Sequence, residues 1–201
     1  MVAKQRGRPR SFDREEALEQ AMLLFWTHGY DATSVADLTR AMGIGAPSLY
    51  AAFGDKRALF EEVVRHYGAR HGDFVGRALA EEPTARRAVE RILREAAADY
   101  TRPGLPRGCL VISAATNCAP ASAEVEEHLR GLRNRNVRAI ESLIEADVAA
   151  GVLPAGTDAR MLARFSGGML QGLSQQARDG ATRAELEAVA ETAMRAWPQE
   201  A

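Results

Sequence analysis

The chain is poor in the features that mark most other protein classes. It holds 2 cysteines and 6% aromatic residues in 201 positions, which indicates reduced thiols and favours helices over a β-sandwich. No run of eighteen apolar residues occurs, and the charged start is not followed by an apolar stretch. We therefore expect neither a membrane span nor a secretory signal.

Sequence signatures of catalysis are also missing. There is no Gly-x-Ser-x-Gly elbow, no glycine-rich phosphate loop and no His-Glu-x-x-His pair, and the 4 histidines have no regular spacing. The sequence thus predicts no enzyme, no cofactor and no metal site. The formal net charge is -1, so a protein that is basic over its whole surface is excluded, and any contact with nucleic acid must be local.

Two short helical patterns, joined by a Gly-Ile-Gly connection, lie between residues 33 and 56. Thr33 or Ser34 can cap the first pattern, whose apolar residues recur at steps of three and four. The connecting glycines permit left-handed torsions, and Pro47 suits the first turn of the second pattern. Together these features predict a helix-turn-helix.

The second of these helices is short and presents a shallow outer face. Leu49 and Phe53 lie four residues apart and are expected to bury, and Gly54 ends the helix after about two turns. Lys56 then opposes the dipole of the next helix, a cost that a DNA phosphate would offset. The alternative is an ordinary helical hairpin with a solvated lysine.

A supporting first helix precedes this motif. Asp13 and Glu16 form a predicted capping box, and an apolar stripe then runs as far as Phe25. With Gly29-Tyr30, Thr33-Ser34-Val35 and the run from Leu49-Tyr50 through Phe53-Gly54-Asp55-Lys56, residues 10 to 60 closely resemble the amino-terminal domain of the TetR family of transcriptional regulators. Ala51-Ala52 departs from the bulkier polar pair of many relatives, which bears on base preference.

The first eleven residues form a predicted basic, disordered arm. Four basic residues and no acid occur among the first ten, a composition suited to lying along phosphates or entering a narrow minor groove. A merely solubilising tail is the alternative. The candidate DNA-binding residues are Arg6, Arg8, Arg10, Thr33, Ser34, Gly45, Ala46, Pro47, Ser48, Tyr50, Ala51 and Lys56.

In the rest of the chain, capping residues, glycines and prolines separate further helical patterns, so we predict an all-α protein. Residues 12–60 form the expected DNA-binding domain, and residues 61–201 form an effector-binding and dimerisation domain. The junction is expected inside a helix that begins after Asp55. Further helices are expected over residues 55–72, 84–100, 108–119, 121–150, 158–178 and 182–197.

The segment from Gly108 to Ala119 carries no charge and predicts a buried helix. Its small polar side chains either bond to the preceding turn or meet a ligand in a cavity. The resemblance to the TetR family favours this helix as a cavity wall. The candidate effector-binding residues are Ile92, Tyr100, Cys109, Ser113, Thr116, Asn117, Ile140, Phe165 and Met169.

Two groups of residues in this part invite other interpretations. Cys109 and Cys118, nine residues apart on one helix, would be separated by about 13.5 Å and half a turn, and therefore cannot pair. Inert thiols are favoured over a metal or oxidant sensor. The arginines of the next helix alternate with glutamates, which favours a solvated face of ion pairs over a second nucleic-acid surface; they are Arg130, Arg133, Arg135 and Arg138.

The last two predicted helices each carry a broad apolar stripe. Gly167, Gly168 and Gly172 cost helix stability, which close approach of another helix would explain. We expect a two-fold dimer built as a four-helix bundle, as the family resemblance also implies. The candidate dimerisation residues are Leu162, Phe165, Gly168, Gly172, Leu186, Val189, Ala193 and Trp197.

The resemblance implies a homodimeric repressor in the bacterial cytoplasm that a small molecule releases from a palindromic double-stranded operator. Two reading helices must then reach successive major grooves about 34 to 36 Å apart. The alternatives are a ligand-binding protein or an enzyme on the same helical scaffold, and a constitutive DNA-binding protein without an effector.

Overall fold

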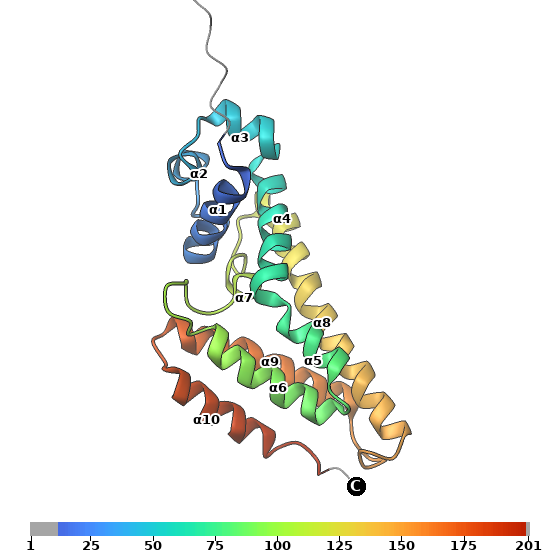
Figure 1. Ribbon diagram of the computed structural model, residues 1–201. Helices are drawn as coiled ribbons and strands as arrows, with labels where there is room; N and C mark the ends of the chain where they lie inside the picture. Colours follow the sequence, from blue (N-terminus) through green and yellow to red (C-terminus); the bar gives the residue numbers. More distant parts are fainter. Residues whose placement is uncertain (1–11, 200–201) are drawn as a thin grey trace, which may run out of the picture.

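A computed structural model describes residues 12–199, and within that range the chain forms helices and no strand. The expected all-α fold is confirmed. Figure 1 shows a small helical unit, residues 14–53, at one end and a larger helical unit at the other. The helices are α1 Arg14–His28, α2 Val35–Met42, α3 Ala46–Phe53, α4 Lys56–Tyr67, α5 Phe74–Glu81, α6 Ala85–Asp99, α7 Leu110–Ser113, α8 Ala123–Ala149, α9 Ala159–Arg178 and α10 Arg183–Met194.

Local signals position the three helices of the small unit. Asp13 caps α1 by accepting from the amides of Glu15 and Glu16, without the reciprocal bond that a capping box requires. Ser34 caps α2 and forms a complete capping box with Asp37. The glycine connection then leads directly into the two turns of α3.

An aromatic cluster joins the small unit to α4. Phe25 of α1 lies edge-on to Phe60 of α4 at 5.0 Å between ring centroids, and Trp26 lies edge-on to Tyr67 at 4.9 Å. All four side chains are fully buried. Because α4 carries both rings into the larger unit, the two units share one hydrophobic core.

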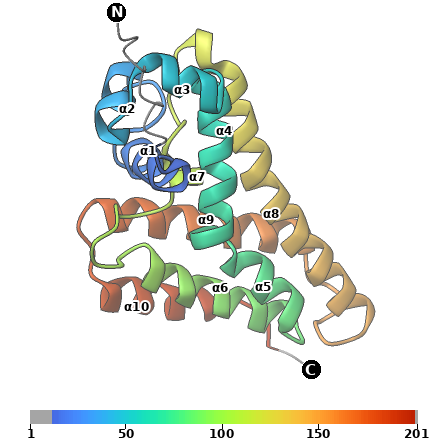
Figure 2. The ribbon, with the colours of Figure 1, turned by 45° about the horizontal axis from the view of Figure 1, so that its top comes forward.

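The larger unit is a stack of helices around α6 and α9. Figures 1 and 2 show α4 and α8 descending together from the small unit, with α6, α9 and α10 crossing below them. A π-helical turn, Gly68–Gly72, separates α4 from α5. The sequence did not predict α5 as a separate helix. No helix within residues 12–199 has the length and hydropathy needed to cross a membrane.

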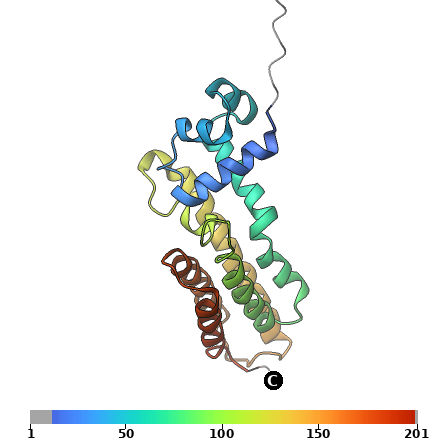
Figure 3. The same cartoon turned by 60° about the vertical axis from the view of Figure 1, so that its left-hand side comes forward.

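The apolar stripe of α10 packs inside its own chain. Leu186, Ala193 and Trp197 are buried, and α10 lies against α6 and α9, as Figure 3 shows for α6. The assignment of these three residues to a dimer interface was therefore wrong, because a surface that is already covered cannot receive a second copy. Val189 is half-buried.

The predicted helix over residues 108–119 is also wrong in extent. Only the single turn Leu110–Ser113 is α-helical, and the chain then crosses towards the small unit before Pro120–Ser122 forms a 3-10 turn. The carbonyl of Ala114 accepts from Tyr30, and the amide of Ala119 donates to Asp31. These tertiary hydrogen bonds replace the intrahelical ones that would have continued the helix.

The three glycines of α9 have different surroundings. A Cβ on Gly167 would lie 2.7 Å from Cγ2 of Val137 on α8, whereas nothing lies within 4 Å of one on Gly168 or Gly172. Gly167 thus permits the close packing of α8 on α9 within one chain. The open side of Gly168 and Gly172 leaves room for another molecule.

We expect Gly167→Ala to lower the free energy of unfolding by about 1 to 2 kcal/mol, because the new methyl group must displace a β-branched side chain. Gly131→Ala on α8 is the matched control, since its Cβ would have only an ordinary contact at 3.8 Å. It should raise the free energy of unfolding by about 0.5 to 1 kcal/mol. Urea denaturation checks both values, and equal effects would contradict the packing assigned to Gly167.

Candidate DNA-binding surface and ligand cavity

The outer face of α3 is exposed and small. Tyr50 is its largest group and is 51% exposed, while the buried Leu49 and Phe53 fix the helix from beneath. The face therefore has the low relief that close approach to a DNA groove requires. Exposed with Tyr50 are Gly45, Ala46, Pro47, Ser48 and Ala51.

Thr33 does not belong to this face. Its side chain is 1% exposed, and its hydroxyl donates to the carbonyl of Gly29 at 2.7 Å. The hydroxyl thus closes the turn after α1 and is not available to DNA. Ser34 remains exposed at the cap of α2.

Lys56 opens α4 beside the small unit. Its Nζ lies 4.2 Å from the ring centroid of Tyr30, and burial lowers the pKa of its ammonium, opposed by the nearby charge of Asp31. The cation–π contact is an intramolecular partner that the sequence did not predict. Arg6, Arg8 and Arg10 lie outside the described residues.

A cavity of about 350 Å³ lies between α4, α5, α7, α8 and α9. Tyr100, Cys109 and Ile140, three of the candidate effector-binding residues, line it. Its walls are mainly apolar and include Val64, Phe74, Ile112, Leu132 and Leu170. A hollow of this size and character is suited to a small organic molecule.

The other predicted cavity residues lie elsewhere. Ile92 is buried in the core without reaching the cavity, and Phe165 and Met169 lie half-buried on α9. Ser113 donates its hydroxyl to Cys109, and the hydroxyl of the exposed Thr116 donates to Ile112. These serine and threonine bonds are the local alternative that the sequence left open. Asn117 is exposed, because the chain leaves α7 before reaching it.

Several polar cavity residues were not predicted, among them Tyr67 and Arg133. Tyr67 lies on α4, the helix in which the sequence placed only the junction between the domains. Arg133 of α8 was placed on a solvated face, yet it follows Leu129 and precedes Val137 at steps of four. Because both neighbours are buried, the helical period could have placed Arg133 on the inner face.

Cys109 and Cys118 are free thiols. Burial raises the pKa of the Cys109 thiol, which keeps it in the less reactive protonated form. Burial also raises the pKa of the half-buried Cys118. No group of three or more His, Cys, Asp or Glu side chains within residues 12–199 is placed to hold a metal ion.

The α7 turn and its continuation connect the cavity wall to the small unit. Val111 and Ile112 line the cavity, and two residues later the carbonyl of Ala114 accepts from the amide of Tyr30 at 2.7 Å. Further along, Asp31 accepts from the amide of Ala119 at 2.6 Å. A displacement of α7 would therefore reach the turn between α1 and α2 directly.

Comparison with known proteins gives concordant matches over most of the chain. A family model described as bacterial regulatory proteins, tetR family, matches residues 17–63, and one described as tetracyclin repressor-like, C-terminal domain, matches residues 83–194. The HTH-type transcriptional repressor ComR of Escherichia coli (strain K12) is 37% identical over 98% of this chain and 95% of that protein. The HTH-type transcriptional repressor BdcR of the same strain is 33% identical over 92% of this chain and 88% of its own.

A solved structure is similar over nearly the whole chain. It is that of a cysteine mutant of the TetR family transcriptional regulator CifR complexed with 26 bp double-strand operator DNA. It has a TM-score of 0.89 and 45% sequence identity, and the match covers 96% of this chain and 100% of that one.

The hydrogen bonds of Asp31 predict a dependence on pH. The bond from Ser122 Oγ, at 2.5 Å, and then the bond from Ala119 lower the pKa of the Asp31 carboxyl. A lowered folded-state pKa means that ionised Asp31 stabilises the fold above its unfolded-state pKa of about 3.9. That contribution is lost as the pH falls through the folded-state value.

We therefore expect Asp31→Asn to be less stable than the wild type at neutral pH, with a difference that shrinks towards about pH 3. Urea denaturation across this range measures it. Glu191→Gln, at an exposed position on α10, is the control and should show little difference at either end. If the free energy of unfolding of Asp31→Asn differs from that of the wild type by the same amount at every pH, the carboxylate charge does not stabilise the contact of Asp31 with Ala119 and Ser122.

Proposed function

The chain belongs to the tetR family of bacterial regulatory proteins and is a DNA-binding transcriptional regulator. From that premise we propose that it is a homodimeric repressor, which a small molecule in the cavity releases from its operator. The operator is then a palindromic double-stranded site, and the protein acts in the cytoplasm beside the DNA. The observation that carries the proposal is the placement of α7 between the cavity and the small unit.

Release follows from the contacts of α7. A ligand that presses on Val111 and Ile112 moves the turn that ends at Ala114, and the hydrogen bond to Tyr30 transmits the movement. Lys56 rests on the ring of Tyr30, so the start of α4 shifts with it. A ligand that favours this shifted arrangement lowers the affinity for the operator by population shift.

On DNA, the exposed face of α3 occupies the major groove. The alanines of this face suit contact with thymine methyl groups, and Ser48 supplies a hydroxyl for base edges, while the hydroxyl of Tyr50 donates to a phosphate. Lys56 at the start of α4 and the arm with Arg6, Arg8 and Arg10 contact phosphates or the minor groove. Since few groups can read base edges, sequence preference rests partly on DNA shape.

The dimer uses the outer stripe of α9. Leu162, Phe165, Met169 and Gly172 recur at steps of three and four and are half-buried in the single chain, and Gly168 between them is open. A second copy of this stripe would cover them and complete a bundle. We assign Val189 of α10, which is half-buried in the single chain, to the edge of this interface.

Two other functions make different predictions. A constitutive DNA-binding protein would bind its operator equally with the cavity empty or filled. An enzyme or ligand carrier on this scaffold would bind a small molecule without selecting DNA. The relatives are transcriptional regulators, which favours regulation over either carriage or catalysis.

Selection of random duplexes by the purified protein tests DNA recognition. Tyr50→Phe and Lys56→Ala should weaken binding to all sequences by about three- to tenfold, through loss of one phosphate contact each. Ser48→Ala should instead change which sequence is enriched. Gel-shift titration at fixed salt measures both effects.

Arg195→Ala, beyond α10, is the control and should retain wild-type binding. Failure to enrich any palindrome by wild type freed of bound ligand would contradict operator recognition. If Ser48→Ala enriches the same DNA sequence as the wild type, Ser48 does not contact bases. That result would leave operator recognition by the rest of the surface unaffected.

Sedimentation tests the dimer. Phe165→Asp should shift the protein towards monomer, because a carboxylate would be buried without a partner at the proposed interface. Thr27→Asp, on an exposed part of α1, is the control and should remain dimeric. A Phe165→Asp variant that stays folded and dimeric would exclude the α9 stripe as the interface.

A further inference from the structure

The charged groups that line the cavity are arginines. Arg65, Arg133 and Arg135 contribute to its walls together with His128, and no aspartate or glutamate does. Arg65, Arg135 and His128 are exposed, whereas Arg133 is half-buried. A cation inside a mainly apolar hollow costs free energy unless an anion accompanies it.

Arg133 has one hydrogen-bond partner in the described part of the chain. Its Nη1 donates to the carbonyl of Val111 at 2.8 Å, and no carboxylate lies within ion-pair distance. Three residues earlier, Arg130 lies 4.0 Å from Glu126 and 3.7 Å from Glu127. A guanidinium has five N–H donors, so most of those of Arg133 remain for a ligand.

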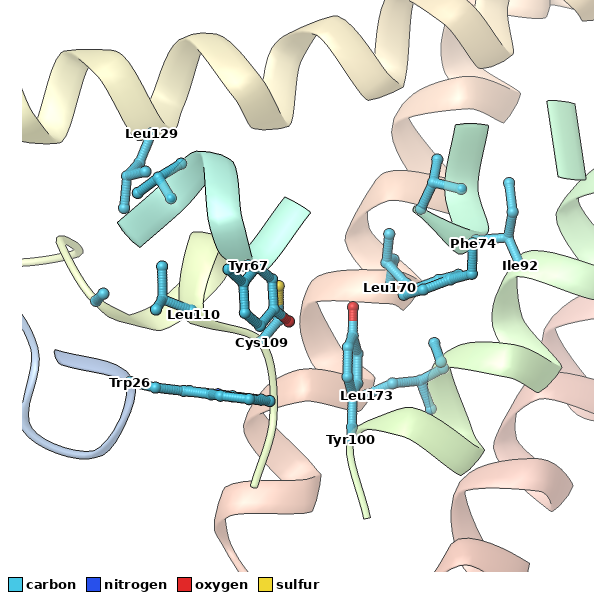
Figure 4. Packing of buried hydrophobic residues seen from close by; sticks show 14 of the residues in the cluster. Trp26, Tyr67, Phe74, Ile92, Tyr100, Cys109, Leu110, Leu129, Leu170 and Leu173 are labelled. Atoms are coloured by element: carbon cyan, nitrogen blue, oxygen red, sulfur yellow. The ribbon is translucent and has the colours of Figure 1, made fainter. Parts of the chain in front are cut away.

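Burial affects the two groups that would meet such a ligand. It lowers the pKa of the Arg133 guanidinium, although a guanidinium stays charged at neutral pH. Deeper in, the hydroxyl of Tyr67 is fully buried beside the thiol of Cys109, a weak hydrogen-bond partner. Figure 4 shows it beside the sulfur of Cys109 and near the hydroxyl of Tyr100.

We propose that the cavity takes an amphiphilic organic anion, such as a carboxylate or sulfonate with an apolar body, whose head group pairs with Arg133. The apolar body lies against Phe74, Ile112 and Leu170, and a polar atom of the ligand meets the hydroxyl of Tyr67. A carboxylate or sulfonate matches the planar fork of the guanidinium. This inference rests on the proposed effector role of the cavity and names the chemical class of the effector.

Charge pairing also gives the ligand a route to α7. The bond from Arg133 to Val111 ties α8 to α7, and an anion that pairs with the free donors draws the guanidinium away from that carbonyl. When the hydrogen bond between Arg133 and Val111 weakens, the turn that carries Ala114 can move. An uncharged ligand of the same shape would fill the cavity without this competition.

Two fluorescent probes of similar skeleton test the charge requirement. Anilinonaphthalene sulfonate carries an anionic head, and phenylnaphthylamine has the same aromatic rings without it. The wild type should bind the sulfonate at least about tenfold more tightly. Decanoate should displace it, and decanol should displace it much less.

Matched variants identify the arginine. Arg133→Met should lose about tenfold in affinity for the sulfonate and retain its affinity for phenylnaphthylamine, while Arg133→Lys should fall between. Arg130→Met, which removes a surface cation, should match the wild type with both probes. Circular dichroism confirms folding, and if Arg133→Met fails to fold, Arg133→Lys and the decanoate–decanol pair still decide the outcome.

Equal affinity of the wild type for both probes would overturn the proposal. An Arg133→Met variant that loses affinity for both probes equally would also overturn it, because Arg133 would then have a structural role only. Operator binding by the ligand-free wild type separates this failure from failure of the proposed function. If the operator is bound but the probes do not discriminate charge, the effector is not an anion. If no operator is bound, the regulatory role itself fails.

Discussion

The hydrogen bond from the amide of Tyr30 to the carbonyl of Ala114 is the constraint on which the arrangement of the two units depends. Gly29 precedes it with φ at 84°, and a Cβ there would lie 3.2 Å from the same carbonyl oxygen. Glycine is therefore needed at this point for both its torsion and its lack of a side chain. The bond brings the chain after α7 against the end of α1 and thereby places the cavity wall next to the DNA-binding helices.

Rigid packing on the other side makes that contact effective. Arg14 of α1 forms a two-pronged ion pair with Glu62 of α4, at 2.6 and 2.7 Å, and lies 4.5 Å from the ring centroid of Phe53 on α3. With the aromatic cluster beneath, α1, α3 and α4 move as one body. A small displacement of α7 is thus passed to the whole small unit, because close-packed interiors shift as units.

Much of this fold follows from sequence patterns. The turn glycines and Ser34 predicted the helix-turn-helix, and the helix expected from residue 182 begins there with a capping box of Thr182 and Glu185. These signals are local, since each cap or turn involves residues within a few positions of one another. The exposed face of α3 followed from the same short-range periodicity.

Long-range contacts account for what the sequence did not predict. The polar bonds of Ala114 and Ala119 to another unit end α7 after one turn, and no local pattern contains that information. The stripe of α10 was correctly apolar, but periodicity does not say whether a helix or a second copy of the chain covers it. Arg133 was misplaced because charge was given more weight than its position between buried neighbours.

Amide hydrogen exchange at Tyr30 tests the central claim, that the cavity and the DNA-binding helices are coupled through α7. With anilinonaphthalene sulfonate in the cavity, we expect exchange at the Tyr30 amide to quicken several-fold, because the displaced carbonyl of Ala114 pulls on this hydrogen bond and lengthens it as the movement is transmitted. The amide of Leu38, which donates within the same unit to the carbonyl of Ser34, should be unaffected. Changes confined to the amides around the cavity, with Tyr30 unaltered, would contradict the coupling.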